Sequence, residues 1–380
     1  GFFHERVNLI VDWYKKVSKD MLMSLQLPSY MGTSGNASSA LAAPMGNYGD
    51  IENKGWEISL NTHPLIGAFE WDSDFQISFN RNKLRALDGT ANAQIVGYGQ
   101  WSDVVSVTNV GESLYNFYGY VCDGVYEDLE DLQTSAKPAK YPADGVFNRT
   151  NTVWVGDIKY KDLNGDGVID ENDRTNIGSP LPKFTFGWTN TFRYKNFDLS
   201  LFINGSYGNK VFNYLGMKLT HMNSPWSNQL NTVLDRAQIV PIDPNKDYSA
   251  GVVVNGVTIY NWYDDITNVR VANAGATIPR ASIQDPNDND RISDRYIEDG
   301  SYIRLKNITL GYTFPGKIIK KWGLDNLRVY ANIQNLLTIT GYSGYDPEIG
   351  ASTASANVYG LDNGRYPSPT VYSFGLNVSF

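Results

Sequence analysis

Apolar and polar side chains alternate along several separate stretches of the 380-residue chain. The clearest alternation places Phe69, Trp71, Phe75, Ile77 and Phe79 opposite Glu70, Asp72, Asp74, Gln76, Ser78 and Asn80. A period of two puts these two sets on opposite faces of a β-strand. The polar set is too acidic for the core of a soluble protein, but it suits the wall of a water-filled lumen.

Similar alternation recurs often enough to predict about eight strands. The other stretches are residues 6–16, 56–61, 184–193, 197–204, 302–314, 327–334 and 370–380. In the last stretch Tyr372, Phe374, Leu376, Val378 and Phe380 share one face. An ordinary soluble sandwich could also end on such a strand. The arrangement of the connections has to decide between a soluble sandwich and a sheet that borders a water-filled lumen.

The connections between these strands alternate between short and long. Short turns at about 62–67, 194–196 and 315–326 separate long connections, of which the longest are 83–183 and 207–300. Outer-membrane barrels have short periplasmic turns and long extracellular loops, whereas connections of this length are uncommon in a compact soluble domain. We therefore predict an all-β fold that forms part of a transmembrane antiparallel β-barrel. Residues 83–183 and 207–300 are expected to be extracellular, and the C-terminus periplasmic.

Two arrangements of the sheet edges remain open. In one, the strands at 6–16 and 370–380 pair with polypeptide outside these residues, because unpaired backbone groups are costly in lipid. In the other, the two edges pair with each other and close a small eight-stranded barrel, whose lumen would be filled by side chains.

Composition narrows the functional classes. Aromatic residues make up 13% of the chain, and Tyr (25) outnumbers Phe (16). Tyrosine suits an interface at which the ring contacts apolar groups and the hydroxyl contacts water. The net charge of -8 and the absence of a Lys/Arg run argue against nucleic acid. Cys122 is the single cysteine, so an internal disulfide is excluded. No stretch of eighteen apolar residues occurs, and residues 1–6 have no signal-peptide pattern; a secreted protein would therefore begin upstream.

Residues 162–173 carry the sharpest motif, with the D-x-N-x-D-G spacing of a calcium loop. Its oxygen donors would be Asp162, Asn164, Asp166, the carbonyl of Val168, Asp170 and Asp173. Hard oxygen ligands at these spacings suit a cation of the size of Ca²⁺. Position 12 is Asp173 where a bidentate Glu is usual, which predicts weaker binding or fewer ligands. We expect a structural Ca²⁺ that fixes an outer loop short of apolar anchors; the alternative is an ion-free turn rich in Asp and Asn.

The residues around this loop resemble the SusC (SusC/RagA-like) family of TonB-dependent outer-membrane transporters of Bacteroidetes. The matching stretches are 156–167, 177–184, 53–57, 301–307, 335–337, 344–348 and 362–367, with the terminal Phe380. The resemblance covers essentially the whole chain, but only the C-terminal part of such a transporter. It implies about 8 C-terminal strands of a probable 22, with the signal peptide, the plug and the N-terminal strands missing here.

The resemblance also implies the partners and the transport activity. These are the remaining N-terminal barrel and plug polypeptide, a SusD-like surface lipoprotein, TonB with ExbB and ExbD, and the barrel-assembly machinery. The function implied is active import of oligosaccharides or oligopeptides across the cell outer membrane.

Two other non-enzymatic functions stay open. A calcium-dependent glycan-binding adhesin could use the aromatic residues Trp226, Trp262 and Tyr263, and it would be soluble without detergent. A passive porin would share the barrel. Enzymatic activity is not expected, because His4, His63 and His221 lie in unrelated segments and no catalytic pattern surrounds them. The acidic pair Asp264–Asp265 fits a solvated loop better than a glycosidase site.

Overall fold

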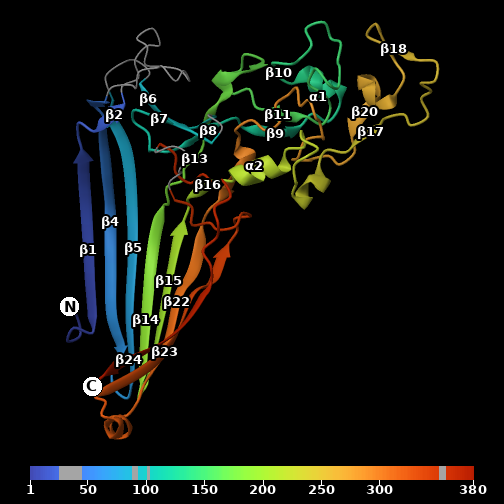
Figure 1. The fold of residues 1–380 in the computed structure, drawn as a ribbon. Helices are drawn as coiled ribbons and strands as arrows, with labels where there is room; N and C mark the ends of the chain where they lie inside the picture. The colour runs from blue at the N-terminus through green and yellow to red at the C-terminus, as the bar shows by residue number, and fades with distance from the viewer. Residues whose placement is uncertain (25–44, 88–92, 101–102, 351–356) are drawn as a thin grey trace.

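The computed structural model describes residues 1–24, 45–87, 93–100, 103–350 and 357–380. Its main element is an eight-stranded antiparallel sheet in the order β1-β4-β5-β14-β15-β22-β23-β24 (Figure 1). The strands are β1 (Val7–Ser18), β4 (Asp50–Leu65), β5 (Phe69–Ala86), β14 (Phe184–Tyr194), β15 (Phe197–Tyr207), β22 (Tyr302–Thr313), β23 (Asn326–Thr340) and β24 (Val371–Ser379). The predicted all-β fold and the predicted count of about eight strands are confirmed.

Neighbouring strands in the sheet are also consecutive among the long strands, so the sheet is a simple meander. Short turns join β4 to β5, β14 to β15 and β22 to β23 at one end. The last of these turns contains the short helices α3 (Gly316–Ile319) and η7 (Lys320–Trp322). All long connections gather at the other end (Figure 1). We call these the short-turn end and the long-loop end.

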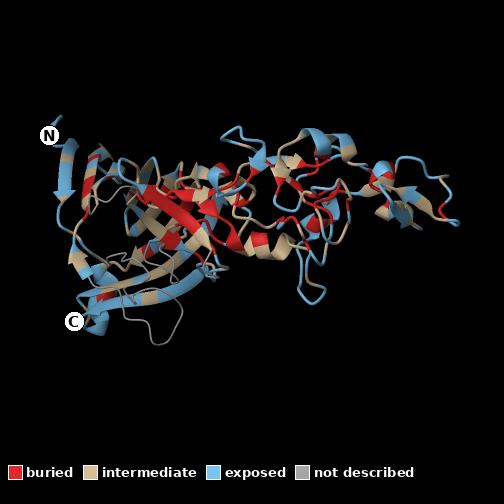
Figure 2. Ribbon diagram, turned by 90° about the horizontal axis from the view of Figure 1, so that it is seen from above, coloured by how far each residue is buried: buried red, intermediate tan, exposed pale blue. Residues whose placement is uncertain are grey.

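The two outer strands do not close the sheet. Within the described residues β1 pairs with β4, β24 pairs with β23, and no ladder joins β1 to β24. Viewed from above, the sheet is a curved wall with the N- and C-terminal strands apart from each other (Figure 2). The described residues therefore do not form the small eight-stranded barrel that the sequence left open.

The register gives the sheet one apolar face and one polar face. One cross-strand row consists of Leu9, Leu60, Phe75, Trp188, Ile203, Leu305 and Leu337. The adjacent row on the other face consists of Asn8, Asn61, Asp74, Thr189, Phe202, Asn307 and Gln334. Because side chains alternate along each strand, the register keeps the apolar sets on the same side. A register shift in β22 places Leu305 and Asn307, two residues apart, in opposite rows.

The long connections fold into a lobe with small elements of its own. The first two connections contain β2 (Leu22–Ser24), β3 (Met45–Asn47), β6 (Gln94–Tyr98), β7 (Val104–Asn109), β8 (Phe117–Gly119), β9 (Cys122–Val125), α1 (Leu129–Thr134), β10 (Lys137–Pro138), β11 (Ile158–Tyr160), β12 (Val168–Ile169), η2 (Glu171–Asp173) and β13 (Thr175–Gly178). The connection from β15 to β22 contains β16 (Lys210–Phe212), α2 (Tyr214–Thr220), η3 (Asn231–Asp235), β17 (Ile239–Pro241), β18 (Val252–Val254), β19 (Val257–Ile259), η4 (Trp262–Asp264), η5 (Ile266–Asn268), β20 (Val269–Val271), η6 (Asp294–Tyr296) and β21 (Ile297–Asp299). None of the described helices is both long and apolar enough to cross a membrane.

Much of the buried apolar core lies in this lobe rather than against the sheet (Figure 2). One cluster unites residues of the 87–183 and 208–301 connections, including Tyr126, Leu132, Trp154, Ile266 and Val269. A second cluster joins three connections through Val105, Phe117, Phe212, Tyr214 and Leu361. The expectation that the outer loop carrying residues 162–173 is short of apolar anchors is wrong, because Tyr160 and Ile169 belong to the first cluster. Apolar residues far apart in the sequence supply the core jointly, so no single loop reveals it.

Candidate functional site

Two belts of aromatic side chains border the apolar face of the sheet. The long-loop belt consists of Trp13, Trp56, Phe79, Phe184 and Tyr207, which follow one another across five strands. Phe184 links the belt, because its ring centroid lies 5.7 Å from that of Phe79 and 5.1 Å from that of Tyr207. The short-turn belt consists of Phe69, Trp71, Phe192, Tyr194, Phe197 and Tyr312. Ring contacts link the first four of these residues to one another and Phe197 to Tyr312.

The separation of the belts matches the apolar thickness of a membrane. Phe69 and Phe79 belong to opposite belts and stand ten residues apart on β5. At ~3.3 Å per residue and a strand tilt of ~40°, that spacing gives a height of ~25 Å. Transmembrane barrels have an apolar band of about 25 Å between aromatic girdles. The expected sides of Phe75 and Asp74 agree with this band.

Polar groups on the apolar face are covered by tryptophan. The side chains of Ser73 and Asn190 are opposite each other in the register and both are buried. The Trp188 indole N–H donates to Ser73 Oγ at 2.9 Å, and the Trp71 indole N–H donates to Asn190 Oδ1 at 3.0 Å. The two rings thus satisfy a polar pair within an otherwise apolar surface.

The polar face carries paired charges near the short-turn end. Arg193 Nη1 lies 2.5 Å from Asp72 Oδ2, and His63 Nδ1 lies 2.6 Å from Asp72 Oδ1. Arg328 binds Asp198 through both Nε and Nη2. These pairs make a hydrated and largely charge-neutral wall there, on which Asp72 and Arg328 stand as expected for a lumen.

The acidic loop is folded tightly on its own backbone. Asp162 Oδ1 and Oδ2 accept from the amides of Gly165 and Gly167 at 2.6 and 2.8 Å, and these bonds lower the pKa of Asp162, so it is ionised at neutral pH. Gly165 and Gly167 have φ of 79° and 83°, a conformation that favours glycine. Asn164 donates to Asp166 Oδ2 at 2.9 Å.

The end of the loop closes back on its beginning. Asp173 is 0% exposed, and its two carboxylate oxygens accept from the amides of Leu163 and Asp170, each at 2.8 Å. Ile169, inside the loop, is buried in the lobe core. The six predicted ligand residues lie in one compact loop, with Asp162, Asn164, Asp166, Val168 and Asp170 at its surface. In the described residues, however, no three carboxylates of this loop come within metal-ligand spacing of one another.

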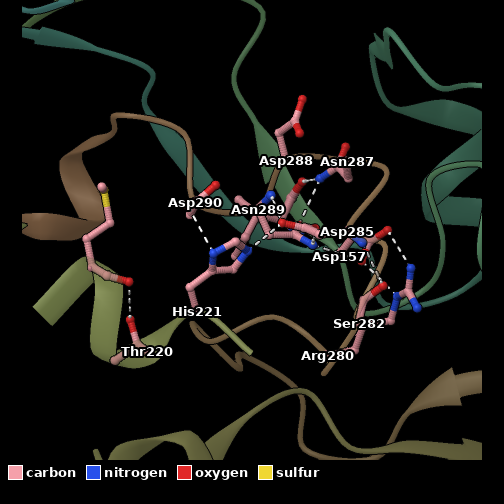
Figure 3. A network of polar contacts seen from close by, with 12 residues as sticks. Asp157, Thr220, His221, Arg280, Ser282, Asp285, Asn287, Asp288, Asn289 and Asp290 are labelled. Carbon is pink, nitrogen blue, oxygen red and sulfur yellow. Dashed lines mark hydrogen bonds and ion pairs between the residues drawn. The ribbon is translucent and has the colours of Figure 1, made fainter. Parts of the chain in front are cut away.

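Sequence reasoning missed a second polar cluster, around His221, which follows α2 (Figure 3). His221 Nε2 lies 2.8 Å from Asp285 Oδ2, and Nδ1 lies 3.0 Å from Asp290 Oδ2. Among the described residues these three side chains are the one acid and histidine group with metal-like ligand spacing. However, each ring nitrogen faces a different carboxylate, which is the geometry of an imidazolium held by two acids.

The pKa of His221 agrees with this interpretation. Burial alone would lower it, but the hydrogen bonds and charges of Asp285 and Asp290 outweigh burial and raise the pKa to about 9. The ring is therefore protonated at neutral pH and donates to both carboxylates. Lys218 adds a cation 3.5 Å from Asp290. The cluster fastens α2 to the segment 285–290.

The same segment also connects the two long connections (Figure 3). The fully buried carboxylate of Asp157 accepts from Arg280 Nε at 2.7 Å and from Asn289 Nδ2 at 3.1 Å. Asn289 Oδ1 in turn accepts from the amide of Ile158 at 2.7 Å, and Asn289 Nδ2 also donates to Asp285 Oδ1. Asp157 and Asn289 are 132 residues apart, which explains why no local motif revealed the network.

The other candidate residues mostly have structural partners. Trp262 packs on the lobe core, and Tyr263 lies under the Arg149 guanidinium. Asp265 is buried and accepts from Lys246 and Tyr248, so the acidic pair 264–265 is part of the packing. Trp226, by contrast, is 93% exposed.

These features define a class: a segment of membrane-spanning antiparallel β-barrel wall with a folded lobe at one end. The comparisons with known proteins agree with that class. No family model matches the chain. It is 32% identical over 388 residues to TonB-dependent receptor P3 of Formosa agariphila, covering 100% of this chain and 33% of that receptor. It is 27% identical over 384 residues to TonB-dependent receptor SusC of Bacteroides thetaiotaomicron, covering 100% of this chain and 31% of SusC.

A structural relative shows the same fold. The RagAB peptide transporter matches with a TM-score of 0.65 and 19% identity, over 100% of this chain and 34% of the transporter chain. The chain thus spans about one third of the length of the relatives that it matches. The resemblance to the SusC-like TonB-dependent receptors noted in the sequence is therefore confirmed. The relatives bear the names of receptors and transporters rather than enzymes.

Proposed function

We propose that this chain is part of the barrel of an outer-membrane transporter that imports nutrients with energy from TonB. The observation that supports the proposal best is the pair of aromatic belts ~25 Å apart on one face of the sheet, with a polar wall behind them. In this orientation the apolar face meets lipid and the polar face lines the lumen. The lobe, including residues 83–183 and 207–300, is then extracellular, and the C-terminus is periplasmic.

The partners follow from the same proposal. The free edges of β1 and β24 pair with the remaining N-terminal barrel polypeptide, because lipid cannot satisfy unpaired backbone groups. A SusD-like lipoprotein covers the lobe, and TonB with ExbB and ExbD acts through the plug. The barrel-assembly machinery inserts the strands. The cargo is an oligosaccharide or an oligopeptide, and the name of the RagAB peptide transporter supports the oligopeptide.

Uptake by whole cells tests this function. Labelled oligopeptides and oligosaccharides are supplied to cells with the complete protein, to cells lacking it, and to cells lacking TonB. We expect uptake of one cargo class to require both the protein and TonB. Uptake that needs the protein but continues without TonB would favour the passive porin, and a protein that stays soluble without detergent would favour the adhesin.

We further propose that the acidic loop binds a structural Ca²⁺. Its donors are Asp162, Asn164, Asp166, Val168, Asp170 and Asp173. Four carboxylates, an amide oxygen and a backbone carbonyl fit a hard cation. Each carboxylate oxygen that accepts one amide keeps further acceptor capacity for an ion. Terbium luminescence competed by Ca²⁺ measures this binding, and the absence of any competition would contradict it.

A further inference from the structure

A patch of cations lies just beyond the long-loop belt, on the same face of the sheet. The register aligns Lys15, Lys54 and Arg81 in one cross-strand row, next to the row of Trp13, Trp56 and Phe79. Lys83 follows one position further up β5 on that face, opposite Glu52. Arg85 follows Lys83 at the next outward position. We call these five cations the basic patch: Lys15, Lys54, Arg81, Lys83 and Arg85.

The patch is only partly neutralised by the protein. Its five cations are all exposed. The carboxylate of Glu52 lies 3.3 Å from Lys15 Nζ and 2.8 Å from Arg85 Nη1. Lys54 and Lys83 have no ion pair with any residue that the structure describes. Like charges directly opposite each other in a sheet are destabilising, so a row of three cations calls for an external anion.

The position of the patch identifies the kind of anion. Lys54 is two positions from Trp56 along β4, which corresponds to a rise of ~5 Å on a tilted strand. The polar headgroup region on each side of a bilayer is about 5–8 Å thick. Neighbouring strands are ~4.8 Å apart, so the directly opposed side chains of Lys15 and Lys54 can reach one phosphate group together. Arg81 Nη1 already donates to the carbonyls of Asn80 and Lys183. Aromatic residues mark the membrane interface, and these cations therefore lie at headgroup height.

We propose that the basic patch binds the phosphate groups of a lipid in the outer leaflet, that is, a phosphorylated glycolipid whose acyl chains lie against the apolar face. The inference rests on the proposed function, because the bilayer position and the orientation come from it. A dissolved anion would have no reason to meet a patch that borders a dry surface. A lipid places its phosphate groups against the cations and its acyl chains below the aromatic belt.

Lipid binding to the complete protein in neutral nanodiscs tests the proposal. The probe is lipid A, compared with enzymatically dephosphorylated lipid A and with inorganic phosphate as a competitor. The test variant combines Lys15→Gln, Lys54→Gln and Lys83→Gln. A matched control combines Lys317→Gln, Lys320→Gln and Lys321→Gln, which removes three cations at the short-turn end. Each Lys near a membrane surface adds roughly 1 kcal/mol, so the test variant should bind lipid A roughly 100-fold more weakly at low salt.

We expect the control, and a variant with Arg at the three tested positions, to bind as the unmodified protein does. Dephosphorylated lipid A should bind as weakly as lipid A binds to the test variant. Inorganic phosphate should not displace lipid A. Equal lipid A binding by the test and control variants would overturn the proposal, as would full displacement by inorganic phosphate. A protein that does not enter nanodiscs at all would overturn the barrel placement itself, and that failure is visible before any lipid is added.

Discussion

The two-acid clamp on His221 makes the stability of the lobe depend on pH. Replacing the ring by His221→Gln removes the imidazolium that donates to Asp285 at 2.8 Å and to Asp290 at 3.0 Å. Asp285, Asp290, Lys218 and Asn289 are the polar groups around the clamp. The change leaves two carboxylates close together with Lys218 as the remaining cation.

The magnitude follows from the pKa of the histidine. A rise from the usual 6.5 to about 9 corresponds to about 3 kcal/mol, at roughly 1.4 kcal/mol for each pKa step. The folded-state pKa is raised, so the protonated ring stabilises the folded lobe. The stabilisation is complete below pH 6.5, where the unfolded chain is also protonated. It declines as the pH rises through 6.5 and is lost above about pH 9.

Hydrogen exchange of the membrane-embedded protein measures this effect. Opening free energies of α2 amides, corrected for intrinsic exchange rates, are compared at pH 6 and pH 9.5. We expect them to fall by up to about 3 kcal/mol in the unmodified protein and to stay level in His221→Gln. The matched control is His4→Gln, because His4 is exposed and has no hydrogen bond or ion pair through its side chain among the described residues. A flat pH profile in the unmodified protein, or an equal slope in His221→Gln, would refute the clamp.

Three further predictions follow from the sheet and the lobe. A membrane-impermeant thiol reagent should label Gln76→Cys and spare Phe75→Cys, because the two side chains are on opposite faces of β5; labelling at position 75 alone would reverse the faces. Arg280→Leu should destabilise the lobe by about 3–5 kcal/mol, measured by lobe proteolysis, because it leaves Asp157 buried without its cation; an unchanged proteolysis rate would show that the charge is accommodated. Asp166→Ala should abolish terbium binding while the protein still folds as a heat-modifiable barrel in gel electrophoresis, and persistent terbium binding would place the ion elsewhere.

The strands were predictable and the lobe was not, for a physical reason. Alternation at residues 69–80 is a local signal, since a strand with one wet face must repeat every two residues. Alternating connection lengths also predicted that the long connections share one end of the meander, as Figure 1 shows. The partners of His221, however, are 64 and 69 residues away, and Asp157 meets Arg280 across 123 residues. Spacings of that kind carry no periodicity.

The basic patch could not be predicted from the sequence either. Its members are far apart in sequence, so the chain contains no Lys/Arg run and its net charge of -8 suggests no affinity for anions. Only the register of β1, β4 and β5 aligns Lys15 with Lys54 and Arg81. The acidic loop is the contrasting case, because its predicted ligands lie within residues 162–173 and a local motif reveals them, although no three of its carboxylates reach metal-ligand spacing in the described residues.

The core shared by the long connections has a consequence for the order of assembly. Leu132 and Trp154 precede β14, whereas Ile266 and Val269 follow β15, and all four belong to one buried cluster. The β5–β14 connection cannot bury its apolar side chains until the β14–β15 hairpin and most of the β15–β22 connection have been added to the chain. If assembly stopped after the first of these connections, the incomplete lobe would expose apolar side chains that favour aggregation, because partly folded states expose apolar groups. Lobe folding is thus a late, long-range event, and it locks β5, β14, β15 and β22 into place together.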